Sequence, residues 1–426
     1  MKKTTRRDSL KALAALATIQ IVPGRVLGAN GKTPPSERPT KAIIGCGSIS
    51  GNHFGIPGEL VAISDVDSNH LANGMENARR RGAKPATYRD WRELIARDDI
   101  DIVHICTPPH WHAIMTIAAA QTGKDIWCEK PMSRTIGEGI AMVREVEKHE
   151  RIFRINTWFR FRNRFYGMRV PVKMIKKAVM HDLLGWPLKV TVSGHTGFNW
   201  KLNAWAGTPG LKPEPVPPEL DYNMWLGPAP KKPYNHRRVH QRFRGYWDYD
   251  GGGLGDMGQH FLDPVQYILD KDGEAPISVE IDADPQHPEA VGVWRRIEYT
   301  YADGCKVVLH GDNAEQNAPY IEGPKGKIFK QFESDIPNFR EKVDQLPDPP
   351  EQNTDFHQCV RERKKFALNE RNAFWSCTMV NMGITAHRLN KSLNFDPKTL
   401  KFDDDEANAL INQPMRAPWT IDGAVL

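Results

Sequence analysis

Two short motifs of this 426-residue chain carry side chains suited to proton transfer. Asp256 and His260 lie four residues apart in "GGGLGDMGQHFLD", and this spacing puts both side chains on one face if the segment is helical. Lys130 stands in "CEKPM", directly after an apolar run. An imidazole changes its charge near neutral pH, whereas a fixed carboxylate or ammonium group can orient a hydroxyl or stabilise negative charge on its oxygen. These residue types suit chemistry at a hydroxyl group, provided that the fold brings them together.

The first third of the chain alternates short apolar runs with amphipathic segments. The apolar runs predict buried strands at 41–46, 60–64, 101–107, 125–130 and 152–157. Helices are predicted between them near 68–81, 90–97, 110–122 and 135–149. Thr135 and Glu138 form a potential capping box at the start of the last helix. This alternation is typical of a doubly wound parallel sheet, in which ligands bind at the carboxyl ends of the strands, and Lys130 follows such an end.

The pattern changes near residue 156. Two-residue alternation in "LKVTVSGH", "ISVEIDA" and "RRIEYTYADGCKVVLHGD" predicts a mostly antiparallel sheet, and the tail returns to helix. We therefore predict an α/β protein with a Rossmann-type domain over 40–155 and an α+β substrate domain over 156–426. Residues 195–250 are rich in Pro, Trp, Tyr and Arg with little periodicity, which is typical of a functional loop.

A dinucleotide site is predicted at the first strand-to-helix turn. In "GCGSISG", Gly45 and Gly47 provide the tight turn and close backbone approach that a pyrophosphate needs, although Ser50 replaces the third glycine of the fingerprint. Asp65 ends the second strand 20 residues after Gly45, where a carboxylate accepts hydrogen bonds from the adenosine ribose. Because no Arg or Lys stands beside Asp65 in "SDVDSN", we predict NAD in preference to NADP.

The N-terminus reads as a twin-arginine signal peptide over residues 1–28. "TTRRDSLK" is followed by an apolar run of about 11 residues, which is too short to span a bilayer, and by small residues suited to cleavage; a disordered basic tail is the alternative. Six cations against Asp8 place +5 of the formal charge of +6 in this segment. The remainder is near neutral, so no nucleic-acid partner is expected. Because the apolar run is so short, no stable membrane anchor is expected either.

The six cysteines show neither a CxxC pair nor metal-ligand spacing. Cys46, Cys106 and Cys128 fall in the apolar runs, and we expect them to be buried free thiols. No metal site is predicted.

In chain order, "GCG", "SDVD", "CTPPHWHA", "CEKP" and "GGGLGDMGQHFLD" resemble the motifs of the glucose-fructose oxidoreductase, inositol dehydrogenase and rhizopine-catabolism family, usually written Gfo/Idh/MocA. The resemblance covers roughly residues 41–420. It is similar to the exported, sugar-acting branch, which often carries a twin-arginine leader and ends in a stretch like "DDEANALINQPMRAPW".

The resemblance implies a catalytic group of Lys130, Asp256 and His260. His260 would act as the base for a substrate hydroxyl, Lys130 would orient that hydroxyl, and Asp256 would fix the substrate or the histidine tautomer. The glycines at 251–253 and 255 would let the backbone turn and approach the cofactor. The implied NAD contacts are Gly45, Gly47, Ser48, Ile49, Asp65, Thr107, Pro108, His112, Glu129 and Lys130.

For the substrate we expect a sugar pocket lined by Trp158, Arg160 and Arg162 of "FRINTWFRFRNRFY", together with Tyr246 and Trp247. Arginines interleaved with rings could also bind single-stranded nucleic acid, but the near-neutral mature chain opposes that reading. Structural packing of these side chains is the other alternative.

Twin-arginine export carries folded proteins, and no free nicotinamide pool is expected outside the cytoplasm. We therefore expect a periplasmic or exported protein whose NAD is loaded before export and held tightly. The leading hypothesis is a dehydrogenase acting on a ring hydroxyl of a sugar or glycoside. The alternatives are an NAD-dependent glycoside hydrolase working through transient oxidation and elimination, and a non-catalytic sugar-binding protein. The resemblance also implies a homo-oligomer, either a dimer or a tetramer.

Overall fold

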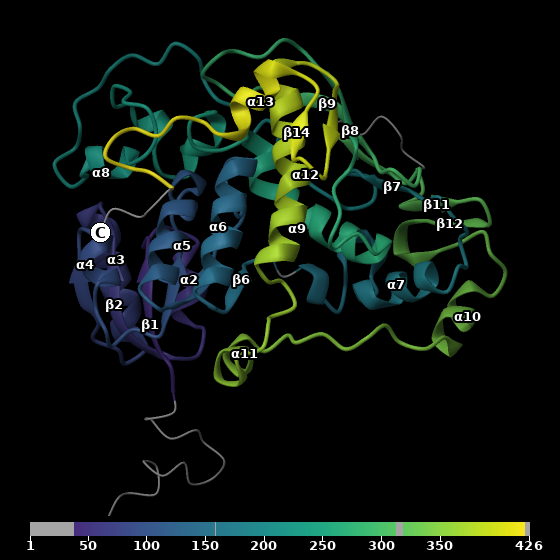
Figure 1. Ribbon diagram of the computed structural model, residues 1–426, viewed down its shortest axis with the longest axis horizontal. Helices are drawn as coiled ribbons and strands as arrows, with labels where there is room; N and C mark the ends of the chain where they lie inside the picture. Colours follow the sequence, from purple (N-terminus) through teal and green to yellow (C-terminus); the bar gives the residue numbers. More distant parts are fainter. Residues whose placement is uncertain (1–37, 158, 312–317, 422–426) are drawn as a thin grey trace, which may run out of the picture.

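The computed structural model describes residues 38–157, 159–311 and 318–421. The predicted signal peptide and Trp158 lie outside these ranges. Two sheets organise the described residues, and Figure 1 shows the long helices α9 (Gly252–Leu269) and α12 (Glu370–Leu389) side by side between them. The predicted fold class is confirmed: a doubly wound parallel sheet is followed by a domain built on a second, mostly antiparallel sheet.

The first sheet is parallel throughout, with the order β3-β2-β1-β4-β5-β6. Its strands are β1 (Thr40–Ile44), β2 (Glu59–Ser64), β3 (Ala86–Tyr88), β4 (Ile102–Ile105), β5 (Asp125–Cys128) and β6 (Phe153–Ile155). The sequence did not predict β3, because its three residues are exposed or half-buried and form no apolar run. The strand order reverses direction between β1 and β4, so the carboxyl ends of these two strands flank a crevice.

The helices of the first domain are α2 (Ser50–Phe54), α3 (Ser68–Arg80), α4 (Trp91–Ile95), α5 (His112–Gln121) and α6 (Ile136–Lys148). The Asp67 carboxylate caps α3 by accepting from two backbone N–H groups. Thr135 caps α6 as predicted, by accepting from the N–H of Glu138. The reciprocal half of the capping box differs: the Glu138 carboxylate accepts from the N–H of Arg134, one residue earlier.

The second sheet has eight strands in the order β12-β11-β7-β10-β9-β8-β13-β14, and only the β7–β10 pair is parallel among these described strands. They are β7 (Lys189–Val192), β8 (Ser278–Ala283), β9 (Trp294–Thr300), β10 (Lys306–His310), β11 (Ile321–Gly323), β12 (Gly326–Ile328), β13 (Leu393–Asp396) and β14 (Lys401–Phe402). The remaining helices are α7 (Val172–Met180), α8 (Tyr222–Leu226), α10 (Phe339–Gln345), α11 (Phe356–Glu362) and α13 (Asp405–Ile411).

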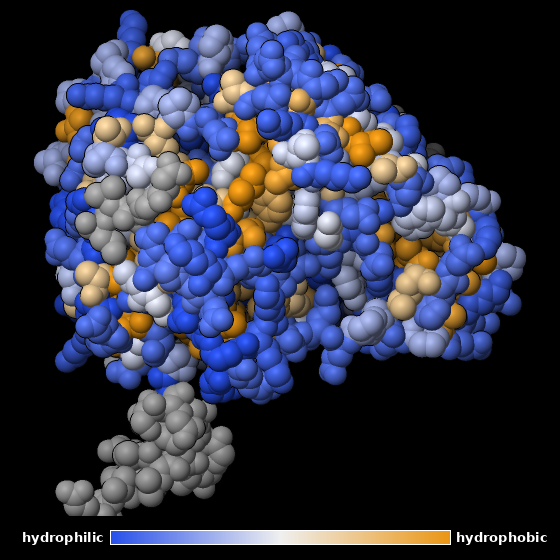
Figure 2. Space-filling model, in the orientation of Figure 1, coloured by the Kyte–Doolittle hydropathy of each residue, from blue (hydrophilic) through white to orange (hydrophobic). Residues whose placement is uncertain are grey.

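Helix α12 joins the two halves, because it packs on α6 of the first domain as well as on α9 and strand β8 of the second. One continuous apolar core accordingly runs through both domains. Figure 2 shows a mostly hydrophilic face on which apolar residues gather near the middle, where α6 and α12 lie in Figure 1. All six cysteines are buried and free, which confirms the expectation for Cys46, Cys106 and Cys128. Among the described residues, no helix is both long and apolar enough to cross a membrane.

Candidate active site

A cavity of about 850 Å³ lies against the carboxyl ends of β1, β4 and β5, within the range of about 300–1,000 Å³ typical of small-molecule sites. Residues of the second domain form the rest of its wall. The fold brings most of the predicted site residues to this one cavity. Those that line it are Gly45, Gly47, Ser48, Ile49, Asp65, Thr107, Pro108, Glu129, Lys130, Asp256 and His260.

The glycine turn after β1 suits a dinucleotide. Gly45 has φ +89°, and a Cβ there would lie 2.8 Å from the carbonyl oxygen of Cys106. A Cβ on Gly47 would meet nothing within 4 Å, so its backbone is open to the cavity, as close approach of a phosphate requires. At the end of β2, the Asp65 carboxylate accepts from the N–H groups of Cys46 (2.6 Å) and Asp67 (2.9 Å). These bonds hold an acceptor at the ribose position, so the residues present fit NAD.

His112 has a different place from the other predicted NAD contacts. It is fully buried, and its ring nitrogens lie 2.7 and 2.8 Å from the carbonyl oxygens of Pro131 and Thr107. Its ring therefore links the loops that follow β4 and β5 and does not line the cavity. We infer that His112 positions Thr107 and the segment around Lys130.

Lys130 and Asp256 meet across the domain boundary. The Lys130 ammonium donates to Asp256 twice, to Oδ1 and to the backbone carbonyl, each at 2.7 Å. Both side chains are almost fully buried. Burial alone would raise the pKa of Asp256, but the charges of Lys130 and Arg244 hold it far below its ordinary value. Asp256 is therefore ionised at every physiological pH.

His260 stands one helical turn after Asp256 in α9, so both side chains reach the same cavity. Its ring stacks on Phe159 with centroids 4.4 Å apart, and Nδ1 lies 3.2 Å from the hydroxyl oxygen of Thr157. Burial first, and then the charge of Lys130, lowers the pKa of His260 to about 3. The imidazole is therefore neutral at physiological pH and has a lone pair that can accept a proton.

Three further side chains surround Asp256 and were not predicted from the sequence. Trp205 donates its indole N–H to Asp256 Oδ2 at 2.7 Å. The Arg244 Nε donates to Oδ1 at 3.0 Å, and the Lys201 ammonium lies 3.3 Å from Oδ2. All three come from the long loop that the sequence marked only by its aromatic and basic composition. The sequence marked Trp205 as one of the aromatic residues of this loop, but it did not show that Trp205 pairs with Asp256, 51 residues later.

Comparison with known families identifies the chain. Residues 40–157 match the NAD-binding Rossmann fold of the Gfo/Idh/MocA oxidoreductase family, and residues 168–421 match the C-terminal alpha/beta domain of the same family. The chain belongs to the Gfo/Idh/MocA oxidoreductase family. Its two family domains follow one another in the order that the sequence motifs predicted.

Curated relatives of this Gfo/Idh/MocA protein include sugar-named enzymes. A levoglucosan dehydrogenase of Pseudarthrobacter phenanthrenivorans is 52% identical over 67 residues, which cover 16% of this chain and 17% of that one. A myo-inositol 2-dehydrogenase of Thermotoga maritima is 29% identical over 63% of this chain and 67% of its own. A glycosyl hydrolase family 109 protein of Shewanella sp. strain ANA-3 is 29% identical over 43% of this chain and 45% of its own. The chain thus matches between 17% and 67% of the length of these relatives.

Among solved structures, the WlbA dehydrogenase of Bordetella pertussis in complex with NADH and UDP-GlcNAcA superposes with a TM-score of 0.58. The identity is 18%, and the match covers 84% of this chain and 98% of that one. At this identity the likeness shows that the two proteins share a fold.

In this Gfo/Idh/MocA protein the glycines before Asp256 provide the predicted turn of the backbone and a close packing of α9. Gly252 has φ +65°, which turns the chain into α9, and a Cβ there would press on Val291. A Cβ on Gly255 would lie 1.8 Å from the Asp250 carboxylate. Val291 and Asp250 both belong to the second domain, so the two glycines allow α9 to pack closely within it.

The expected sugar contacts from Arg160 and Arg162 are corrected by the structure. The Arg160 side chain is 1% exposed and pairs with Asp263 at 2.7 Å and Asp272 at 2.6 Å. Arg162 lies with its guanidinium carbon 4.3 Å from the centroid of the Phe159 ring, and the same ring stacks on His260. Neither arginine is among the residues that line the large cavity.

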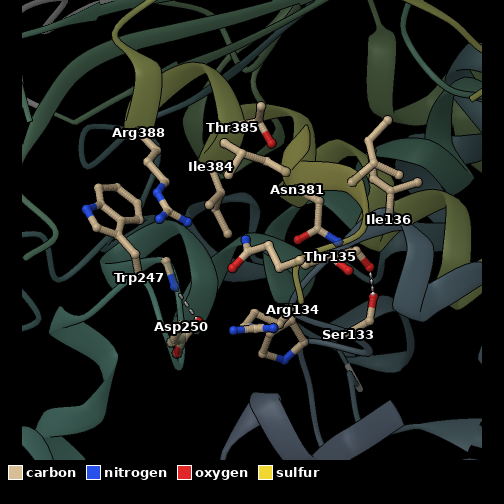
Figure 3. Close-up of a pocket in the computed structure, with 15 residues that line it drawn as sticks. Ser133, Arg134, Thr135, Ile136, Trp247, Asp250, Asn381, Ile384, Thr385 and Arg388 are labelled. Atoms are coloured by element: carbon tan, nitrogen blue, oxygen red, sulfur yellow. Dashed lines mark hydrogen bonds between the residues drawn. The ribbon is translucent and has the colours of Figure 1, made fainter. Parts of the chain in front are cut away.

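Tyr246 and Trp247 also lie outside the large cavity, which corrects their predicted role. The Tyr246 hydroxyl bonds to the backbone of Thr208, and the Trp247 indole donates to the carbonyl of His287. Trp247 instead lines a separate cavity of about 20 Å³ together with Arg388 (Figure 3), which has room for about one water. Asp250 lines both cavities and so forms part of the wall between them.

The fold also assembles one group that residue spacing could not reveal. Ligand-type atoms of Asp67, His70 and His240 all lie within 4.8 Å of one another, although His240 comes from the other domain. His70 also lies 3.7 Å from the Asp65 carboxylate, and this contact raises the pKa of the histidine. These residues gather where the second domain meets the predicted adenosine end of the cavity.

Proposed function

We propose that this protein is an NAD-dependent oxidoreductase that acts on a ring hydroxyl of a sugar or glycoside. The observation that carries the proposal is the meeting of Lys130 and Asp256 across the domains, with His260 beside them, in the cavity that begins at the glycine turn. One domain supplies the nucleotide turn and the ammonium group, and the other supplies the carboxylate and the imidazole.

The reaction removes a hydride from the carbinol carbon and a proton from its oxygen, which leaves a ketone. Bound NAD supplies the hydride acceptor. The Lys130 ammonium donates to the substrate oxygen and stabilises the negative charge that develops there. The neutral imidazole of His260 accepts the hydroxyl proton. Asp256 holds the Lys130 ammonium in place at the cavity wall through the two 2.7 Å bonds.

We further propose that NAD is held tightly and is preferred over NADP. The support is a clasp, formed by residues 219–221 of the second domain on residues 66–68, which follow β2. The Ser68 N–H donates to the Glu219 carbonyl, and the Asp221 N–H to the Val66 carbonyl, each at 3.0 Å. Arg89 donates to the carbonyls of Val66 (2.6 Å) and Glu219 (3.0 Å). A dinucleotide ribose at Asp65 would leave only after this clasp opened, and the Asp65 carboxylate would repel a 2′-phosphate.

A retained cofactor agrees with the twin-arginine motif of the N-terminus, and we propose export to the periplasm or beyond. We also propose a dimer or tetramer formed through the face of the eight-stranded sheet that carries the exposed side chains of Glu280 and Asp282. Light scattering on the purified protein tests the assembly, and fractionation of cells that express the full chain tests the location.

The central experiment is mass spectrometry of the small molecules released when the purified protein is denatured. NAD in near-equal molar amount to the protein is the expected result, and recovery of no nicotinamide would refute the proposal. Addition of the right sugar to the native protein should then raise the absorbance of reduced nicotinamide. The Lys130→Met and His260→Ala variants should still release NAD but should reduce it about 10² to 10⁴ times more slowly.

A second candidate function is supported by the similarity to a glycosyl hydrolase family 109 protein. In this alternative, oxidation at a ring carbon acidifies the neighbouring C–H, the aglycone is eliminated, water adds and the hydride returns. Free sugar would appear without net reduction of NAD. A substrate deuterated at the carbon next to the anomeric centre would lose its label to solvent, whereas a simple dehydrogenase would leave that label in place.

A further inference from the structure

The catalytic end of the cavity holds more positive than negative charge. Lys130, Lys201 and Arg244 all contact a single carboxylate, that of Asp256, at 2.7, 3.3 and 3.0 Å. Three cations against one anion leave a net charge of +2 at this point. The Lys130 and Asp256 side chains are only 9% and 5% exposed, so water screens this pair poorly.

None of the other acids that line this cavity forms an ion pair with these three cations. Glu129 is already paired with His53 at 2.8 Å and also accepts from Asn156. Asp65 lies at the far, ribose end. Asp250 is buried, and its carboxyl group is protonated in part of the molecules at neutral pH because burial raises its pKa to about 7. An oxidised nicotinamide is itself a cation, so a bound cofactor would increase the excess.

Lys201 and Arg244 are held in position by an aromatic platform. The Lys201 ammonium lies 6.0 Å and the Arg244 guanidinium 4.8 Å from the ring centroid of Trp205, which itself bonds to Asp256. Lys201 has a left-handed backbone with φ +53°, a conformation that costs a non-glycine residue free energy. Both side chains line the cavity, and they remain 41% and 20% exposed, so they are accessible to a ligand.

We propose that the substrate carries a carboxylate and that Lys201 and Arg244 bind it, so that the enzyme acts on a uronic acid or its glycoside. This inference rests on the proposed function and names its substrate class. A guanidinium carries several N–H donors that suit a carboxylate. Arg244 directs Nε to Asp256 and Nη1 to the carbonyl of Gln241, so its Nη2 and the Lys201 ammonium are the donors that we assign to the substrate carboxylate. An anionic substrate balances the charge that Asp256 alone leaves uncompensated.

The test is calorimetric binding to the NAD-loaded protein. Methyl glycosides of glucuronic, galacturonic and mannuronic acid are compared with the matching neutral methyl glycosides and with glucose 6-sulfate. We expect at least one uronide to bind about ten-fold or more tightly than its neutral partner, with the difference shrinking as salt is added. Equal or tighter binding of every neutral sugar, binding of no uronide, or a preference for the sulfate would overturn the assignment.

The variant Lys201→Gln separates a ligand contact from support of Asp256. It should lower uronide affinity by roughly ten-fold more than it lowers the affinity for a neutral glycoside. An equal loss for both classes would mean that Lys201 only supports Asp256. Lys212→Gln, an exposed lysine of the same loop, is the matched control. If neutral sugars reduce the bound NAD while uronides fail to bind, this inference falls and the proposed function stands.

Discussion

Asp250 is a buried carboxyl group whose surroundings oppose its ionisation. Burial is the largest cause, and the nearby Arg244 only partly offsets it, so the pKa rises from its ordinary 3.8 to about 7. Its carboxylate accepts from the Gly251 N–H at 2.7 Å, which tethers it at the start of α9. A group with a raised folded-state pKa stabilises the fold below its unfolded pKa and loses that contribution as the pH rises through its folded pKa.

Asp250→Asn should therefore change the pH dependence of stability. Between pH 3.8 and about 7 the wild-type protein should lose unfolding free energy relative to the variant, by at most about 4 kcal/mol. The amide oxygen of asparagine can still accept from Gly251. Urea denaturation across this pH range measures the difference. Parallel curves for the two proteins would contradict the prediction, and Asp98→Asn, at an exposed acid, should give parallel curves.

At the scale of an element, the first turn of α9 depends on the absence of one side chain. A Cβ on Gly255 would lie 1.8 Å from Asp250 Oδ1, a distance that no contact tolerates. Gly255→Ala should cost about 2 kcal/mol or more of unfolding free energy, because either the helix or Asp250 must move.

Urea denaturation of a double-mutant cycle identifies the cause of that loss. In Asp250→Ala/Gly255→Ala the clash is removed, so the two changes together should cost less than the sum of their separate effects. Additive effects would mean that another neighbour opposes the new Cβ. Gly273→Ala is the control, since a Cβ there would meet nothing within 4 Å.

An element was predictable from the sequence where its burial required a continuous run of apolar residues. Strands β1, β4 and β5 are fully or almost fully buried, so their apolar runs identified them. The end of α11 could not be predicted from the sequence. The helical pattern continues past Arg363, but this residue ends the helix by adopting a left-handed backbone with φ +53°. The exposed strand β3 gave no signal either.

The site residues likewise fall into those that a local motif predicts and those that only the fold brings together. Gly45, Lys130 and Asp256 stand in motifs that can be read locally, and the fold brings them to one cavity. Lys201 and Arg244 contact Asp256 only because their loop folds back onto it, and no local sequence pattern predicts that fold. Arg160 illustrates the reverse case, because a basic residue among aromatic rings looked like a ligand contact, but two distant carboxylates bind it.

At the scale of the whole molecule, we propose that the clasp between the domains limits the rate at which a bound dinucleotide leaves. Arg89→Ala removes two hydrogen bonds from the clasp. At about 1 kcal/mol each, their loss should speed the release of NAD by roughly ten-fold or more. Dialysis of the loaded protein, followed by quantification of the retained nicotinamide, measures this rate.

Arg80→Ala is the matched control for that experiment, because Arg80 pairs with Glu76 on the same helix and does not bridge the domains. The two variants should differ clearly in retained nicotinamide. Equal retention would mean that the clasp does not limit release.

A closed clasp has a kinetic consequence. If the dinucleotide stays in place, electron donor and electron acceptor must occupy the same cavity in turn, each entering after the previous product has left. Steady-state rates would then follow a double-displacement pattern, with parallel reciprocal plots for the two sugars. At high concentration each sugar would inhibit the half-reaction of the other, and the preferred acceptor would resemble the ketone form of the donor.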